Sequence, residues 1–206
     1  MRVLKGIKQG EAAWLKAKLG VVTGTRIKKA IAKDNLPLVD EIIAERGSQV
    51  IDDDSYTSEA MQRGKDMEPV AVRVYEKQTG LVCKEVGFGL HDTYDWLGIS
   101  PDRFVMVGRK RRKGIEVKCP GTKKHVQYIR QDQIPAEYRG QVLNYFLCEP
   151  DCETVDFISY DDRFKPKPLF IKTVTREEVR KELDDLEAEL IKFWNKVKSY
   201  EDKILF

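Results

Sequence analysis

Three residues between positions 102 and 118 have types and spacing that could bind a metal ion and activate water. Asp102 follows a proline, and Glu116 and Lys118 stand two residues apart in the β-rich segment GIEVKC. Residues two apart in a strand point to one face, so Glu116 and Lys118 should project together, and a hairpin would bring Asp102 beside Glu116. Two carboxylates on adjacent strands, with waters and the carbonyl of Val117, are the hard oxygen ligands that Mg²⁺ or Mn²⁺ prefers. Lys118 would then hold or polarise the attacking water.

A salt-bridged surface hairpin would also explain this short pattern, and Glu68 adds a second indication of a site. Glu68 lies on a predicted helix with Val72 and Tyr75 at i+4 and i+7, so its carboxylate should share a face with buried apolar side chains. A buried carboxylate needs a partner, which would be the metal or an arginine such as Arg63.

Gln141 and Tyr145 add a third indication, because they stand at i and i+4 on one face of another predicted helix. Both side chains carry hydrogen-bonding groups that could reach a phosphate or the nucleophilic water. Ordinary helix packing would explain the same spacing.

The elements that must position these residues follow from periodicity and from turn residues. Helices are expected over residues 11–19, 26–33, 39–47, 58–78, 122–131 and 136–148, and from a capping box at 175–178 to residue 197. Short β-rich segments predict an antiparallel meander and two later strands, over residues 81–90, 95–100, 103–107, 114–119, 154–160 and 168–174. The apolar stripe of the last helix is predicted to be a core face, with a subunit interface as the alternative.

The composition predicts one soluble domain, residues 1–206, with a net charge of +3. The first residues lack the apolar run of a signal peptide, and no stretch approaches the length of a membrane span. We therefore expect an unsecreted, cytoplasmic protein. The four cysteines lack the paired spacing of a zinc site or an iron–sulfur cluster, so reduced, structural thiols are expected.

Several motifs, in this order, resemble the phage lambda-type (YqaJ-like) alkaline exonucleases of the PD-(D/E)XK nuclease superfamily. The resemblance runs from about Trp14 to Asp161 and rests on GVVTGT, RGKDMEPVAVRVYE, SPDRFV, GIEVKCP, IPAEYRGQVLNY and FISYD. It implies a mixed α/β fold with a restriction-endonuclease-like core, in which helices flank a central mixed sheet. Carried over by motif, it implies Glu68, Asp102 and Glu116 as metal ligands, Lys118 as the catalytic lysine and Gln141 as a supporting residue.

The activity that the resemblance implies is 5′-to-3′ digestion of one strand of linear double-stranded DNA, with two Mg²⁺ ions for which Mn²⁺ can substitute. It also implies a ring-shaped homotrimer, a recombinase that anneals single strands as partner, and a phage or prophage origin in a bacterial host. A structure-specific endonuclease and an inactive DNA-binding module are the alternatives.

Other candidate DNA-binding residues lie outside the catalytic motifs. Lys18 precedes a turn, and Thr25 and Arg26 follow it at the start of a predicted helix. Together they could bind a 5′ phosphate, although Lys18 and the Gly-Thr pair depart from the pattern of relatives, and an ordinary capped helix with exposed lysines is the alternative. The loop GRKRRKG, with Arg109, Arg111 and Arg112, could grip the DNA backbone or be only a solvated hairpin tip. Tyr145 and His125 could also touch DNA, but a lone histidine is more often structural.

Overall fold

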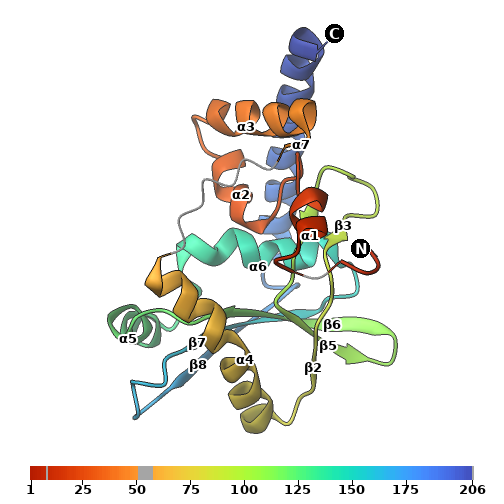
Figure 1. Cartoon of the computed structure of the whole chain (residues 1–206). Helices are drawn as coiled ribbons and strands as arrows, with labels where there is room; N and C mark the ends of the chain where they lie inside the picture. The colour runs from red at the N-terminus through yellow and green to blue at the C-terminus, as the bar shows by residue number, and fades with distance from the viewer. Residues whose placement is uncertain (8, 51–57, 206) are drawn as a thin grey trace.

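The computed structural model describes residues 1–7, 9–50 and 58–205, and a five-stranded sheet is its central element (Figure 1). The strand order is β2-β5-β6-β7-β8, in which only β6 and β7 run parallel to each other. The strands are β2 (Cys83–Lys84), β5 (Arg103–Val107), β6 (Lys110–Lys118), β7 (Thr154–Tyr160) and β8 (Leu169–Thr175). The predicted mixed α/β fold, with a central mixed sheet flanked by helices, is confirmed.

A second, smaller sheet corrects the predicted meander. It has the order β1-β3-β4 and consists of β1 (Arg2–Val3), β3 (Gly89–Leu90) and β4 (Gly98–Ile99). The segment expected as one strand over 81–90 is therefore split between the two sheets. The ring of Phe88 is buried and lies against Gly98, where any side chain would overlap it. This contact draws the second half of the segment away from β5 and onto β4.

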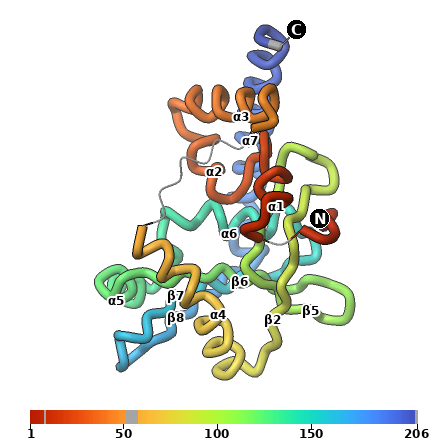
Figure 2. Tube along the Cα trace, in the orientation of Figure 1, coloured from red at the N-terminus to blue at the C-terminus, as the bar shows by residue number. Residues whose placement is uncertain are grey.

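Helices cover both faces of the five-stranded sheet (Figures 1 and 2). The helices are α1 (Ala12–Ala17), α2 (Gly24–Ala30), α3 (Leu36–Ser48), α4 (Glu59–Thr79), α5 (Thr122–Gln131), α6 (Ala136–Cys148) and α7 (Arg180–Leu205). Ile115 and Val117 of β6 pack with Val72 and Tyr75 of α4 on one face. Residue 116, between them, points to the opposite face, which is the face that α6 covers.

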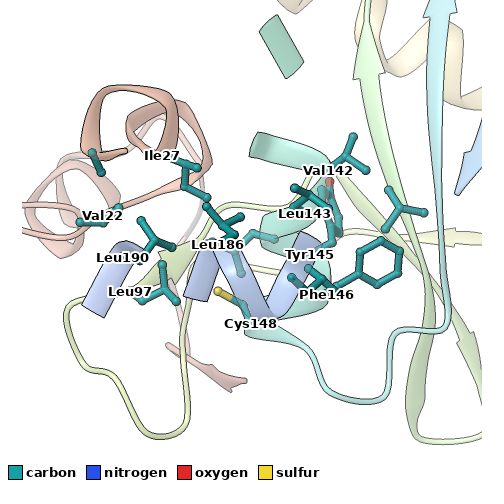
Figure 3. Close-up of a cluster of buried hydrophobic side chains, with 14 of the residues drawn as sticks. Val22, Ile27, Leu97, Val142, Leu143, Tyr145, Phe146, Cys148, Leu186 and Leu190 are labelled. Carbon is teal, nitrogen blue, oxygen red and sulfur yellow. The ribbon is translucent and has the colours of Figure 1, made fainter. Parts of the chain in front are cut away.

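The larger hydrophobic core lies between α6, α7, α2 and the small sheet (Figure 3). The stripe predicted for the last helix is buried as a core face, and Trp194 within it stacks on Trp96 with ring centroids 5.1 Å apart. The predicted capping box forms, because Thr175 and Glu178 exchange backbone and side-chain hydrogen bonds, but α7 begins only at Arg180. Within the described residues, no helix is both long enough and apolar enough to cross a membrane.

The basic segment predicted as a loop is mostly strand. Only Gly108 and Arg109 form the turn, with Gly108 at a φ of +59°, and β6 then starts at Lys110. Arg111 and Arg112 therefore lie within β6, which runs about 25 Å from Lys110 to Lys118 at a rise of roughly 3.3 Å per residue. The basic hairpin and Lys118 stand at opposite ends of this strand.

Gly114 of β6 is expected to be intolerant of a side chain, because an added Cβ would overlap the buried ring of Tyr145. Gly114→Ala should lower the free energy of unfolding by about 1–3 kcal/mol, the usual cost of overpacking a core. Gly64→Ala in α4 is the matched control, because nothing lies within 4 Å of its added Cβ. The control should stabilise the helix by about 0.5–1 kcal/mol. Urea unfolding measures both, and equal stability of the two variants would contradict the prediction.

Candidate active site

The fold brings the predicted catalytic residues into one cavity of about 200 Å³. Asp102 precedes β5, Glu116 and Lys118 lie in β6, and Gln141 lies in α6. All four line the cavity. The structure therefore places these side chains as the sequence predicts, although their roles in catalysis remain predictions.

Asp102 is fixed by hydrogen bonds to its backbone and to its side chain. Its amide donates to the hydroxyl of Tyr145 at 2.9 Å, and that hydroxyl donates to the carbonyl of Ile115 at 2.8 Å. One carboxylate oxygen of Asp102 accepts the amide of Val117 at 2.7 Å. Tyr145 is 1% exposed and forms part of the cavity wall, so it positions Asp102 from the core. Its predicted contact with DNA stays a prediction.

Lys118 is held between two acceptors above an aromatic ring. Its Nζ donates to Glu116 at 2.5 Å and to Oε1 of Gln141 at 3.1 Å, and it lies 5.0 Å from the ring centroid of Tyr138. Burial lowers the pKa of Lys118, but the carboxylates of Glu116 and Asp102 outweigh burial and leave the pKa above its ordinary value. Lys118 is therefore a protonated ammonium group at neutral pH, suited to stabilising negative charge.

The carboxylates of the cavity repel one another. Burial raises the pKa of Asp102 well above its ordinary value, and the nearby charges of Glu116 and Glu68 raise it further. The positive charge of Lys118 opposes this shift only in part. A divalent cation would relieve the excess negative charge, and carboxylate oxygens are the donors that Mg²⁺ and Mn²⁺ prefer. The donor set of Asp102 and Glu116 therefore fits such an ion.

Glu68 is not assembled with this pair. Its carboxylate accepts from Arg103 at 3.0 Å, and Arg103 also pairs with Glu85 at 3.0 Å. Arg63, the arginine that the sequence suggested, binds Asp161 and Asp162 instead. In the described ranges, no three His, Cys, Asp or Glu side chains are grouped so that they could hold a metal ion. Glu68 is nevertheless near enough to Asp102 for its charge to raise the pKa of that carboxyl group.

The predicted phosphate pocket is only partly formed as expected. Lys18 and Thr25 line the same cavity as Lys118, and the Nζ of Lys18 lies 3.9 Å from the ring centroid of Trp14. Burial and the neighbouring Arg26 lower the pKa of Lys18. Arg26 itself binds Glu41, Glu45 and the carbonyl of Val21, so its guanidinium joins α2 to α3 and does not line the cavity.

The other predicted DNA contacts lie away from the cavity. The side chain of His125 is fully buried, with ring nitrogens 2.8 Å from the hydroxyl of Ser159 and 2.8 Å from the carbonyl of Lys167. Arg111 pairs with the buried carboxylate of Glu149, and Arg112 pairs with Glu153 at 2.5 Å. Arg109 lies in the hairpin turn, at the end of β6 that is remote from Lys118.

Two residues that the sequence analysis did not assign also belong to the site. The indole Nε1 of Trp14 donates to the hydroxyl of Ser100 at 3.0 Å, and both residues line the cavity. Ser100 stands two residues before Asp102, at the end of the strand predicted over residues 95–100, and a small polar residue at a strand end does not by itself indicate a site. The proximity of Trp14 to Ser100 is a contact between residues 86 positions apart, and no local pattern reveals such a contact.

Comparisons with known proteins agree with the fold. The model of the YqaJ-like viral recombinase domain matches residues 13–149. Two solved structures of LHK-Exo, an alkaline exonuclease from Laribacter hongkongensis, are similar over 94% of this chain and 96% of theirs. The structure in complex with dAMP has a TM-score of 0.84 and 29% identity, and the other has 0.83 and 28%. A phage-related exonuclease from Haemophilus somnus 129PT shares the fold, with a TM-score of 0.59, 16% identity and coverage of 90% of this chain and 95% of its own.

No curated protein gives a significant match. The likeness to alkaline exonucleases over nearly the whole chain supports a nuclease enzyme. The chain belongs to the YqaJ-like viral recombinase domain family, and the resemblance seen in its motifs is confirmed.

Tyr145→Phe is expected to disturb the site without changing its charge. The substitution leaves the amide of Asp102 and the carbonyl of Ile115 without their buried partner, at a cost of about 1–3 kcal/mol in the free energy of unfolding. Cleavage should fall because the Asp102 carboxylate loses its support. Tyr128→Phe is the matched control, because that buried hydroxyl donates only to Glu137 at the surface. Urea unfolding and turnover measure both variants, and wild-type turnover in Tyr145→Phe would contradict the positioning role.

Proposed function

We propose that the protein is a metal-dependent exonuclease that digests one strand of linear double-stranded DNA from its 5′ end and leaves a 3′ overhang. The observation that carries the proposal is the convergence of Asp102, Glu116, Lys118 and Gln141 in one cavity that Lys18 also lines. This cavity lies in a fold shared with alkaline exonucleases, one of which was solved in complex with dAMP. DNA is therefore the substrate that the site suits best.

Asp102 and Glu116 would hold Mg²⁺ or Mn²⁺, joined by Glu68 and the carbonyl of Val117 in the full ligand set. The family resemblance suggests two ions, and a bound divalent ion supplies positive charge next to the scissile phosphate. Gln141 would orient the attacking water through its amide. Lys118, protonated and fixed by Glu116 and Gln141, would stabilise the negative charge that develops on the phosphate.

The test is digestion with Mg²⁺ of a linear duplex labelled at either end, with a covalently closed circle of the same sequence as control. We expect loss of the linear duplex only, with release of the 5′ label first. Glu116→Gln should abolish cleavage while binding survives, because it removes a carboxylate ligand and leaves most phosphate contacts in place. Cleavage of the closed circle would support an endonuclease. Turnover of Glu116→Gln within tenfold of the wild type would contradict the assignment of this cavity as the active site.

The cavity also suggests how the 5′ end is recognised. The ammonium group of Lys18 and the hydroxyl of Thr25 would hold the 5′ phosphate next to the catalytic groups. Arg26 would contribute only by holding α2, because its guanidinium is bound to Glu41 and Glu45. In the free protein the ammonium of Lys18 lies over Trp14, and a phosphate would give this group an anionic partner.

Lys18→Ala is expected to change end preference without removing the metal requirement. The wild type should digest a 5′-phosphorylated duplex faster than a 5′-hydroxyl duplex, and Lys18→Ala should lose most of that difference. Lys16→Ala is the matched control, since Lys16 lies in the last turn of α1, two residues before Lys18, and does not line the cavity. The measurement is the initial rate of digestion of the 5′-phosphorylated duplex and of the 5′-hydroxyl duplex. Equal rates in the wild type would show that this pocket does not recognise the 5′ phosphate.

The family also suggests the setting in which the nuclease works. We propose that residues 1–206 act as a single nuclease domain in phage-type recombination, inside the cytoplasm of a bacterial host. A homotrimeric ring would enclose the duplex, and a single-strand annealing recombinase would receive the 3′ overhang. The support for this setting is the family match to a viral recombinase domain.

A further inference from the structure

The turn between β7 and β8, residues 161–168, carries exposed positive charge that the catalytic cavity does not use. Its sequence is DDRFKPKP, and Arg163, Lys165 and Lys167 are all exposed. Arg163 is paired with Asp161, whereas Lys165 and Lys167 form no ion pair with any residue that the structure describes. Two prolines alternate with these lysines and restrict the backbone that presents them.

This turn leaves the sheet at the catalytic end. β6 and β7 run parallel, with Lys118 opposite Ser159, so the chain beyond Tyr160 emerges at the end of the sheet where Lys118 lies. The guanidinium of Arg163 contacts the carbonyl of Pro120, two residues after Lys118, at 3.4 Å. The turn and α5 lie together at that end of the sheet in Figure 1.

Buried polar groups hold the turn in place. The carboxylate of Asp161 is fully buried and accepts from Arg63 of α4, from Thr122 of α5 and from Arg163 of the turn itself. Burial alone would raise the pKa of Asp161, but the hydrogen bonds from Arg163 and Thr122 lower it to about 2, so this carboxylate stays ionised. Donors still exceed acceptors here, because Nη1 of Arg63 is buried with no partner among the described residues.

His125 fixes the far side of the same turn. Because a carbonyl only accepts, Nε2 of His125 must donate to the carbonyl of Lys167, and Nδ1 then accepts the hydroxyl of Ser159 in the neutral ring. The ring also meets Phe164 edge-on, with centroids 5.9 Å apart. The backbone that carries Lys165 and Lys167 is therefore anchored from α5, and their ammonium groups are left at the surface.

We propose that the β7–β8 turn is a phosphate-binding surface that contacts the backbone of the duplex through Lys165 and Lys167. The inference rests on the proposed function. When the end of a duplex lies in the cavity, the rest of the duplex extends outside the cavity and can contact the protein surface there. Duplex DNA carries a negative charge about every 1.7 Å along its axis, so an unpaired cation at the catalytic end of the sheet meets phosphates. Each contact releases counterions and contributes to affinity without reading sequence.

Most of the charge in the β5–β6 hairpin is already paired, although its sequence is more basic, and only Arg109 at the tip has no ion pair with a described residue. Lys110 pairs with Asp151 at 2.9 Å, Arg112 pairs with Glu153 at 2.5 Å, and Arg111 pairs with Glu149. The hairpin also stands at the opposite end of β6 from Lys118. Charge that is already balanced, and that is remote from the cavity, adds little to the binding of a duplex end.

The experiment measures the affinity for a blunt linear duplex in EDTA over a series of salt concentrations, with three variants of the full chain. Lys165→Gln with Lys167→Gln should reduce the slope of log Kd against log salt by about two, since each phosphate contact contributes roughly 0.9. Lys165→Arg with Lys167→Arg keeps the charge and should keep the slope. Lys110→Gln with Arg112→Gln removes the same charge from the hairpin and should leave the slope unchanged.

The proposal is overturned if the double variant Lys165→Gln, Lys167→Gln has the same salt slope as the wild type. It is also overturned if the double variant Lys165→Arg, Lys167→Arg loses as much of the slope as the glutamine variant does. Cleavage is scored separately, with Mg²⁺ on the wild type. If the wild type digests linear DNA but the glutamine variant has the wild-type salt slope, only the proposed binding surface is contradicted. If the glutamine variant has a smaller salt slope but the wild type does not cleave DNA, the binding surface is supported and the proposed function is contradicted.

Discussion

The geometry of the cavity depends on one buried hydroxyl group, that of Tyr145. It joins the start of β5 to the middle of β6, because it accepts the amide of Asp102 and donates to the carbonyl of Ile115. A buried polar group without a partner costs about 1–3 kcal/mol, so this bridge strongly favours one position for Asp102. Gly114 leaves room for the ring, since any side chain there would overlap it. The placement of the candidate catalytic carboxylate of Asp102 is therefore decided in the core between α6 and β6.

The same cavity gathers charge that does not help the free protein to fold. Burial and the charge of Glu116 hold the pKa of Asp102 above its ordinary value, which shows that the ionised carboxylate is disfavoured there. The protein partly compensates through Lys118 and through the pairing of Glu68 with Arg103. Sites that keep an unfavourable charge are commonly functional, because a ligand of opposite charge can then bind with a gain in free energy.

Local sequence patterns predicted most of the elements but not their long-range partners. Strands β5 to β8 and the helices over 122–131 and 136–148 follow from periodicity, and the motif spacing placed Glu116, Lys118 and Gln141 together. The pattern could not show that the segment 81–90 divides between two sheets, because the cause is contact of Phe88 with Gly98. It offered Arg63, from closeness in sequence, as the alternative to a metal partner for Glu68, whereas the arginine that binds Glu68 is Arg103, 35 residues away. The partners of Tyr145 and His125, and the bonds of Arg26 to Glu41 and Glu45, were not predicted for the same reason, since they come from residues distant in the sequence.

The distribution of charge along β6 explains why the most basic segment of the sequence need not be the DNA-binding surface. Asp151 and Glu153 precede β7, which pairs in parallel with β6, so they lie beside the basic end of β6 and neutralise it. At the other end of the strand the carboxylates of Glu116 and Asp102 dominate. Lys165 and Lys167, on the β7–β8 turn at that end of the sheet, have no acidic partners in the described part of the chain. A run of like charge in a sequence therefore indicates binding only after the acids that the fold brings to it are known. Here the parallel pairing of β6 with β7 supplies those acids to the hairpin, and the turn that carries the lysines without acidic partners leaves the sheet at the end where Lys118 lies.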